Sequence, residues 1–157
     1  DGGGWLDHAR LGFNYRLDDV RAAIGVGQLE KLDAILESRA SVAVRYNDLL
    51  AGIDGLELPC PDDEDHTRSW FVYVVGLPEG VDREAVISSL EARGVQTARY
   101  LPCIHLQSYM RERYGFREGL CPVAEETSRR TLALPFHARL DAEDQAYVAD
   151  ALRGALG

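Results

Sequence analysis

The stretch that decides how this chain is understood reads Gly12-Phe13-Asn14-Tyr15-Arg16-Leu17 and continues into Asp18-Asp19-Val20-Arg21-Ala22-Ala23-Ile24-Gly25. An aromatic, amide and arginine cluster in a loop thus stands directly before a pattern typical of a long helix. A helix start presents unpaired backbone N–H groups and a partial positive charge, so it holds anions well. Asn14 can donate two hydrogen bonds, and Arg16 offers a planar, permanently charged guanidinium. Both are therefore candidates for binding a phosphate or carboxylate; a capping amide beside a solvated arginine is the alternative.

Length and composition indicate one ordinary globular domain. The chain has 157 residues, of which 46% are hydrophobic and 27% charged, as expected for such a domain. Its net charge of −9 argues against a nucleic-acid surface, which needs clustered cations, but not against a small anion held by local arginines. No apolar run approaches the roughly 18 residues of a membrane span, so no membrane partner is expected.

The cysteines and histidines show no ligand spacing. The three cysteines are widely separated and lack a C-x-x-C or Cys/His pattern, so no metal site is predicted. An odd cysteine count suits a reducing cytosol better than a disulfide scaffold. We therefore expect a cytoplasmic protein.

A helical pattern extends from about Leu17 to about Leu50, after a glycine-rich loop at residues 1–16. Apolar residues recur along it at helical spacing, and its length predicts a kink near residues 33–38. Gly25 and Gly27 interrupt good helix formers, which indicates close packing against another helix.

Short strands and helices alternate in the rest of the chain. Apolar runs predict strands over 70–75, 95–100 and 132–134, the first of them central and covered on both faces. Helices are predicted over 82–93, 106–114 and 122–130, and from Asp141 onward. The expected fold class is α+β: a small, mainly antiparallel sheet covered by helices, with a long N-terminal helix.

Further segments, in a fixed order, give the sequence a resemblance to a known family. They are Gln28-Leu29-Glu30-Lys31-Leu32-Asp33, Arg99-Tyr100-Leu101-Pro102-Cys103-Ile104-His105-Leu106-Gln107, Pro122-Val123-Ala124-Glu125-Glu126 and Leu132-Ala133-Leu134-Pro135. With residues 12–25 they resemble the C-terminal region of DegT/StrS-type sugar aminotransferases, pyridoxal-phosphate enzymes that act on nucleotide-linked keto-sugars. The resemblance covers nearly the whole chain. It implies that residues 17–157 form the C-terminal small domain of a fold-type I aminotransferase, and that residues 1–16 are an arm continuing from a large domain upstream.

The resemblance also implies roles for particular residues. The family's asparagine at the position of Asn14 reaches into the neighbouring subunit and binds the cofactor phosphate, which implies a homodimer with composite active sites. Tyr15 and Arg16 are expected to line the same site and to bind substrate. Arg99 and His105 are expected to bind the diphosphate of a nucleotide-sugar. For His105, a buried histidine that donates to a backbone carbonyl carries equal weight.

Trp70 and Arg68 are not expected to bind a ligand. Trp70 could pack near a ligand, but its run of apolar neighbours favours the core. Arg68 is expected at the surface.

The catalytic lysine of the family lies in the large domain, outside this segment. The chain's single lysine, Lys31, falls within the helical pattern and is interpreted as a solvated helix-face residue. The resemblance thus implies the C-terminal domain of a pyridoxal-phosphate aminotransferase, with no catalytic residue in this segment. The enzyme it implies transfers an amino group, typically from glutamate, to a nucleotide-linked keto-deoxysugar in polysaccharide or antibiotic sugar biosynthesis. One alternative is a non-catalytic binding or regulatory module of the same fold, and a weaker one is an unrelated α+β interaction domain.

Overall fold

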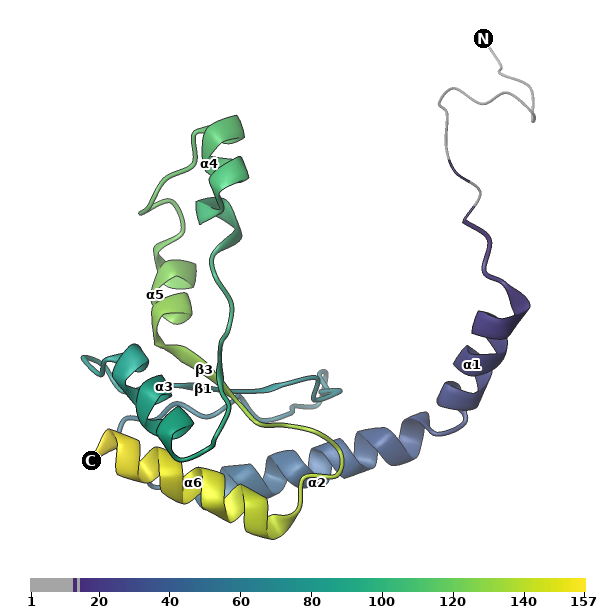
Figure 1. Cartoon of the computed structure of the whole chain (residues 1–157), viewed down its shortest axis with the longest axis horizontal. Helices are drawn as coiled ribbons and strands as arrows, with labels where there is room; N and C mark the ends of the chain where they lie inside the picture. Colours follow the sequence, from purple (N-terminus) through teal and green to yellow (C-terminus); the bar gives the residue numbers. More distant parts are fainter. Residues whose placement is uncertain (1–12, 14) are drawn as a thin grey trace. The chain divides into compact units, whose positions relative to one another are not determined.

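The computed structural model describes residue 13 and residues 15–157. Asn14, the predicted ligand of the cofactor phosphate, therefore lies outside the described residues. The chain divides into two units, Asp1–Asp33 and Ala34–Gly157, and each is described by itself. Figure 1 labels the helices and strands.

The first unit contains the helix α1 (Asp19–Leu29). Asp18 precedes it as the N-cap, and its carboxylate accepts a hydrogen bond of 2.9 Å from the Arg21 N–H. The predicted continuous helix is interrupted at residues 30–31, earlier than the expected kink, and α2 (Leu32–Leu50) follows. Two glycines weaken the helix just before this break, because glycine costs about 1 kcal/mol relative to alanine in a helix.

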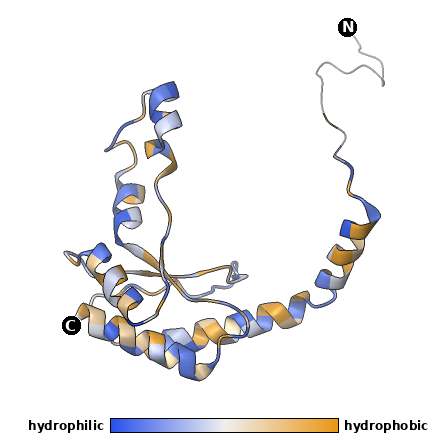
Figure 2. Ribbon diagram, in the orientation of Figure 1, coloured by the Kyte–Doolittle hydropathy of each residue, from blue (hydrophilic) through white to orange (hydrophobic). Residues whose placement is uncertain are grey.

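Apolar side chains of α1 are exposed in the described structure. Figure 2 shows hydrophobic residues along this helix, and Val20, Ile24 and Leu29 are all more than half exposed. A Cβ added at Gly25 or Gly27 would meet nothing within 4 Å among the described residues. The close packing predicted at these glycines is thus not found within the described part of the chain.

The second unit is built on a small antiparallel sheet, as predicted. Its strands are β1 (Tyr73–Gly76), β2 (Ala98–Arg99) and β3 (Thr131–Leu134), in the order β1-β3-β2. β3 pairs with both neighbours, and Leu132 lies opposite Val75 on one side and Arg99 on the other. The first strand was predicted to be central, and this is wrong: β1 begins only at Tyr73 and lies beside β3, which takes the central position.

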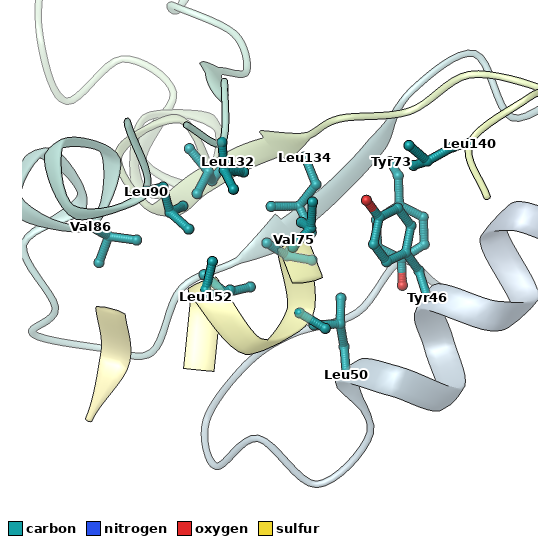
Figure 3. Close-up of a cluster of buried hydrophobic side chains, with 14 of the residues drawn as sticks. Tyr46, Leu50, Tyr73, Val75, Val86, Leu90, Leu132, Leu134, Leu140 and Leu152 are labelled. Atoms are coloured by element: carbon teal, nitrogen blue, oxygen red, sulfur yellow. The ribbon is translucent and has the colours of Figure 1, made fainter. Parts of the chain in front are cut away.

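Helices α2, α3 (Arg83–Ala92) and α6 (Ala142–Leu156) supply the core together with the sheet. Figure 3 shows the buried side chains that meet there, among them Tyr46, Leu50, Tyr73, Val75, Leu90, Leu132 and Leu152. The two tyrosines keep their hydroxyls satisfied: Tyr46 donates to the Pro135 carbonyl at 2.9 Å and Tyr73 to Asn47 Oδ1 at 2.6 Å. Their burial raises the pKa of both phenols well above the usual range.

Between β2 and β3 the chain forms an excursion away from the sheet (Figure 1). It contains a 3₁₀ helix, η1 (Ile104–Leu106), then α4 (Ser108–Tyr114) and α5 (Pro122–Arg130). The helix predicted over 106–114 is therefore shorter than expected and has a 3₁₀ turn before it. Pro122 opens α5, as predicted, because its fixed φ and missing N–H suit the first turn of a helix.

Replacing Asp82 with alanine is expected to lower the free energy of unfolding by about 1 kcal/mol. The Asp82 carboxylate caps α3 by accepting from the backbone N–H groups of Glu84, at 2.9 Å, and Ala85, at 3.4 Å. Urea denaturation of the two proteins measures the change. The matched control is Asp54→Ala in an exposed turn, which should shift stability by less than about 0.5 kcal/mol; equal losses in the two variants would contradict the capping role.

Candidate functional site

Arg99 lies in β2 and joins it to helix α3. Its Nε donates to Glu84 Oε1 at 2.8 Å, and its Nη2 donates to the second oxygen of the same carboxylate. The hydrogen bond to Arg99 lowers the pKa of Glu84, and the same bond raises the pKa of Arg99. Both side chains remain exposed, so the guanidinium keeps donors for a further anion. Its predicted contact with a diphosphate stays a prediction.

His105 lies in η1 and is held by a carboxylate. Its Nε2 is 2.8 Å from Glu125 Oε1, and the two side chains are only 11% and 4% exposed. The alternative prediction for His105 was a hydrogen bond to a backbone carbonyl. In the structure its hydrogen-bond partner is the Glu125 side chain. This pair fixes η1 to the first turn of α5.

Glu125 belongs to the candidate site through its contact with His105, and the sequence analysis did not predict a role for it. Besides His105, it accepts hydrogen bonds from the N–H groups of Gly119, at 3.0 and 2.9 Å to its two oxygens, and Cys121, at 3.1 Å. The Gly119 N–H, followed by His105, holds the pKa of this carboxyl below its usual value. A signal was present: an acid in the first turn of a helix opened by proline can reach back to the capping residue.

The predicted site residues do not form one cluster in the described structure. Tyr15 and Arg16 belong to the first unit, where both are exposed, whereas Arg99 and His105 belong to the second. Within that unit, each of the two contacts a different carboxylate. Within the second unit these two residues therefore form separate ion pairs, Arg99 with Glu84 and His105 with Glu125.

The described residues give no attachment point for pyridoxal phosphate. Lys31, the chain's single lysine, is exposed at the turn between α1 and α2. We therefore assign no step of cofactor chemistry to it.

Residue 13 and residues 15–157 contain neither a metal-ligand cluster nor a membrane-spanning helix. In that part of the chain, no group of three or more histidine, cysteine, aspartate or glutamate side chains could hold a metal ion. None of its helices is both long and apolar enough to cross a membrane.

Two adjoining hollows lie beside β1. They share Arg68, Val72 and Tyr100, and each has a volume of about 380 Å³. The first is lined mainly by the segment that leads into β1, from Thr67 to Val72. The second follows the outer face of the strand toward Val74 and Gly76. Volumes of this size suit a small-molecule ligand.

The fold defines an α+β unit of the kind found in pyridoxal-phosphate aminotransferases. The sequence model of the DegT/DnrJ/EryC1/StrS aminotransferase family matches residues 3–153. The chain belongs to this family.

Three solved structures are similar to this chain over most of its length. The aminotransferase TlmJ from Streptoalloteichus hindustanus is 36% identical, with a TM-score of 0.77 over 88% of this chain and 36% of that one. DesV from S. venezuelae, solved in complex with a ketimine intermediate, is 32% identical, with a TM-score of 0.82 over 96% of this chain and 39% of DesV. A DegT DnrJ EryC1 StrS aminotransferase from Brucella abortus is 30% identical, with a TM-score of 0.79 over 99% and 40%. The chain thus spans about two-fifths of the length of these proteins.

Proposed function

We propose that this chain is the C-terminal small domain of a pyridoxal-phosphate aminotransferase that aminates a nucleotide-linked keto-deoxysugar. The observation that carries the proposal is the family match along residues 3–153, together with 36% identity to the aminotransferase TlmJ and 32% to DesV. The amino donor is glutamate, and the protein works in the cytoplasm in polysaccharide or antibiotic sugar biosynthesis.

In this proposal the cofactor and its lysine are held mainly by a large domain outside this segment. The exposed position of the single lysine supports this division of roles between two domains. The chain also spans only about two-fifths of the length of its relatives, which supports the same division. When bound, pyridoxal phosphate supplies an electron sink for the reacting carbon. This chain binds and orients: Asn14 holds the cofactor phosphate, and Tyr15, Arg16, Arg99 and His105 contact the substrate.

The proposed enzyme is a homodimer with composite active sites, to which residues 1–16 of one copy contribute an arm that enters the other. The exposed apolar side chains of α1, such as Ile24 and Leu29, support a covered position for this helix in the assembled protein. Burying such a face stabilises the assembly by about 25 cal/mol per Å² of apolar surface removed from water.

A visible absorption spectrum of the purified protein with pyridoxal phosphate, recorded before and after glutamate, tests the proposal. We expect the band of lysine-bound cofactor, which bleaches when glutamate is added, because a lysine-bearing domain accompanies this segment. The treated sample is then given a nucleotide-linked keto-sugar, and mass spectrometry should detect the amino sugar.

The opposite outcome identifies the alternative function. A spectrum of free cofactor that glutamate leaves unchanged would contradict the aminotransferase proposal. It would favour a binding or regulatory module that keeps the fold without turnover.

A further inference from the structure

Glu125 is the one charged residue that is buried among the described residues. Backbone groups hold its carboxylate: the Gly119 N–H donates to both oxygens and the Cys121 N–H to one of them. Gly119 has a φ of +87°, a backbone conformation that favours glycine. Burial of a charge is costly unless the charge is hydrogen-bonded. The loop before α5 thus builds a fixed position for this carboxylate.

The same backbone donors decide which ring nitrogen of His105 carries a proton. A backbone N–H can only donate, so it requires an acceptor, and the lowered pKa of Glu125 keeps the carboxyl group ionised. His105 Nε2 lies 2.8 Å from Glu125 Oε1, and two acceptors that faced each other at this distance would repel. Nε2 therefore carries a proton and donates it to Glu125.

The other ring nitrogen of His105, Nδ1, is left open. Residue 13 and residues 15–157 offer it no hydrogen-bond partner, yet it is not one of the polar atoms that are enclosed without a partner. Solvent therefore reaches Nδ1, although the side chain as a whole is only 11% exposed. Such an atom, on a ring fixed from its other side, suits contact with a ligand.

We propose that Glu125 is a positioning residue, which orients His105 so that Nδ1 is the atom that contacts the substrate. A ring held at Nε2 by a buried carboxylate presents Nδ1 in one direction, so binding costs little side-chain entropy. Phosphate oxygens only accept, so toward a diphosphate Nδ1 donates from the protonated ring, whose charge Glu125 balances. The inference rests on the proposed function, in which His105 contacts the substrate, and it adds the residue that holds His105 and the atom that His105 offers.

Nitrogen NMR of the complete protein, with isotope-labelled histidine, tests the orientation of the ring. The signals of His105 are identified by their loss in His105→Gln. In the neutral ring of wild type we expect a proton on Nε2 and none on Nδ1. Glu125→Gln should give a mixture of both tautomers, because glutamine has a single acceptor oxygen for donors that two oxygens now receive. A wild-type ring protonated at Nδ1 and not at Nε2 would overturn the inference.

Isothermal titration with thymidine diphosphate and uridine diphosphate tests the contact with a ligand. His105→Gln keeps a donor near the position of Nε2 and has nothing at the position of Nδ1. It should raise the Kd of the nucleotide that wild type binds more tightly about tenfold or more, and Glu125→Gln should raise it by a similar factor. In the double variant the second substitution should add nothing, because both act through one ring. Additive losses would show that Glu125 does not act through His105.

Matched controls separate positioning from a loss of stability. Glu126→Gln changes the neighbouring exposed carboxylate, and His66→Gln removes an exposed histidine. Asp82→Ala lowers stability at the start of α3, away from both members of the pair in sequence. None of the three should change either dissociation constant. The titrations are made at a temperature at which circular dichroism shows every variant to be folded.

The outcomes separate this inference from the proposed function. If the complete protein aminates a nucleotide-linked sugar but Glu125→Gln binds both nucleotides as wild type does, or wild type binds neither, the inference is wrong and the function stands. If the tautomer and the double variant behave as expected but no amination is found, the positioning of His105 for a ligand stands and the function fails.

Discussion

Replacing Leu132 with alanine is expected to lower the free energy of unfolding by about 2–5 kcal/mol. Leu132 is fully buried in the central strand, so the truncation loses the transfer free energy of the removed groups and also leaves a cavity that the surrounding strands and helices fill only in part. Urea denaturation followed by circular dichroism measures the difference between variant and wild type.

The control for Leu132 is Leu101→Ala, because Leu101 is 60% exposed. This variant should change stability by less than about 0.5 kcal/mol. A loss at Leu132 no larger than the loss at Leu101 would mean that β3 is not the centre of the core.

Glu125→Gln is expected to destabilise the protein more than Asp82→Ala does. The Glu125 carboxylate satisfies His105 and the N–H groups of Gly119 and Cys121, whereas the amide of glutamine has a single acceptor oxygen and brings two donors of its own. Leaving nearly buried donors without acceptors costs more than losing an exposed cap. The midpoint of urea denaturation provides the comparison, with Glu126→Gln on the exposed face of the same helix as the control.

The same carboxylate predicts a pH dependence. Its pKa in the folded protein lies below its usual value, which is about 4.3 in an unfolded chain. The unfolded state therefore binds more protons in this window, so the stabilisation is complete above the unfolded pKa and is lost as the pH falls through the folded pKa.

Urea midpoints measured from pH 6 down to about pH 3 should consequently fall more steeply for wild type than for Glu125→Gln. Glu84 and Asp63, whose pKa values are also lowered, are present in both proteins and cancel in the comparison. Parallel slopes would show that Glu125 does not gain its charge-dependent hydrogen bonds in the folded state.

Local signals in the sequence predicted the local structure well. Asp82 and Asp141 cap helices and Pro122 opens one, as expected, because capping depends on residues within one turn. The position of β1 at the side of the sheet could not be predicted in this way, since strand order follows from pairing between segments far apart in the chain. The start of β1 was also predicted too early, because no residue near Trp70 indicates that its φ is positive or that Arg39, 31 residues earlier, donates to its carbonyl.

The candidate site, like the fold, could be predicted from the sequence only in part. Motif order predicted the family, which the family match confirms, but it did not predict which groups the site residues contact. Arg99 meets Glu84 across 15 residues of sequence, and His105 meets Glu125 across 20. Such pairs join elements that are separated in the chain, β2 with α3 and η1 with α5, so neither spacing nor composition could reveal them.

The shortness of β2 has a consequence for how the protein behaves at high concentration. A sheet edge with free N–H and C=O groups is a template on which strands of other molecules can add, and aggregation starts there. At this edge the chain offers only the two residues of β2, one of which is an arginine engaged with a glutamate. A strand so short and so charged gives an incoming chain little backbone to pair with, and the sheet is protected against growth from that side.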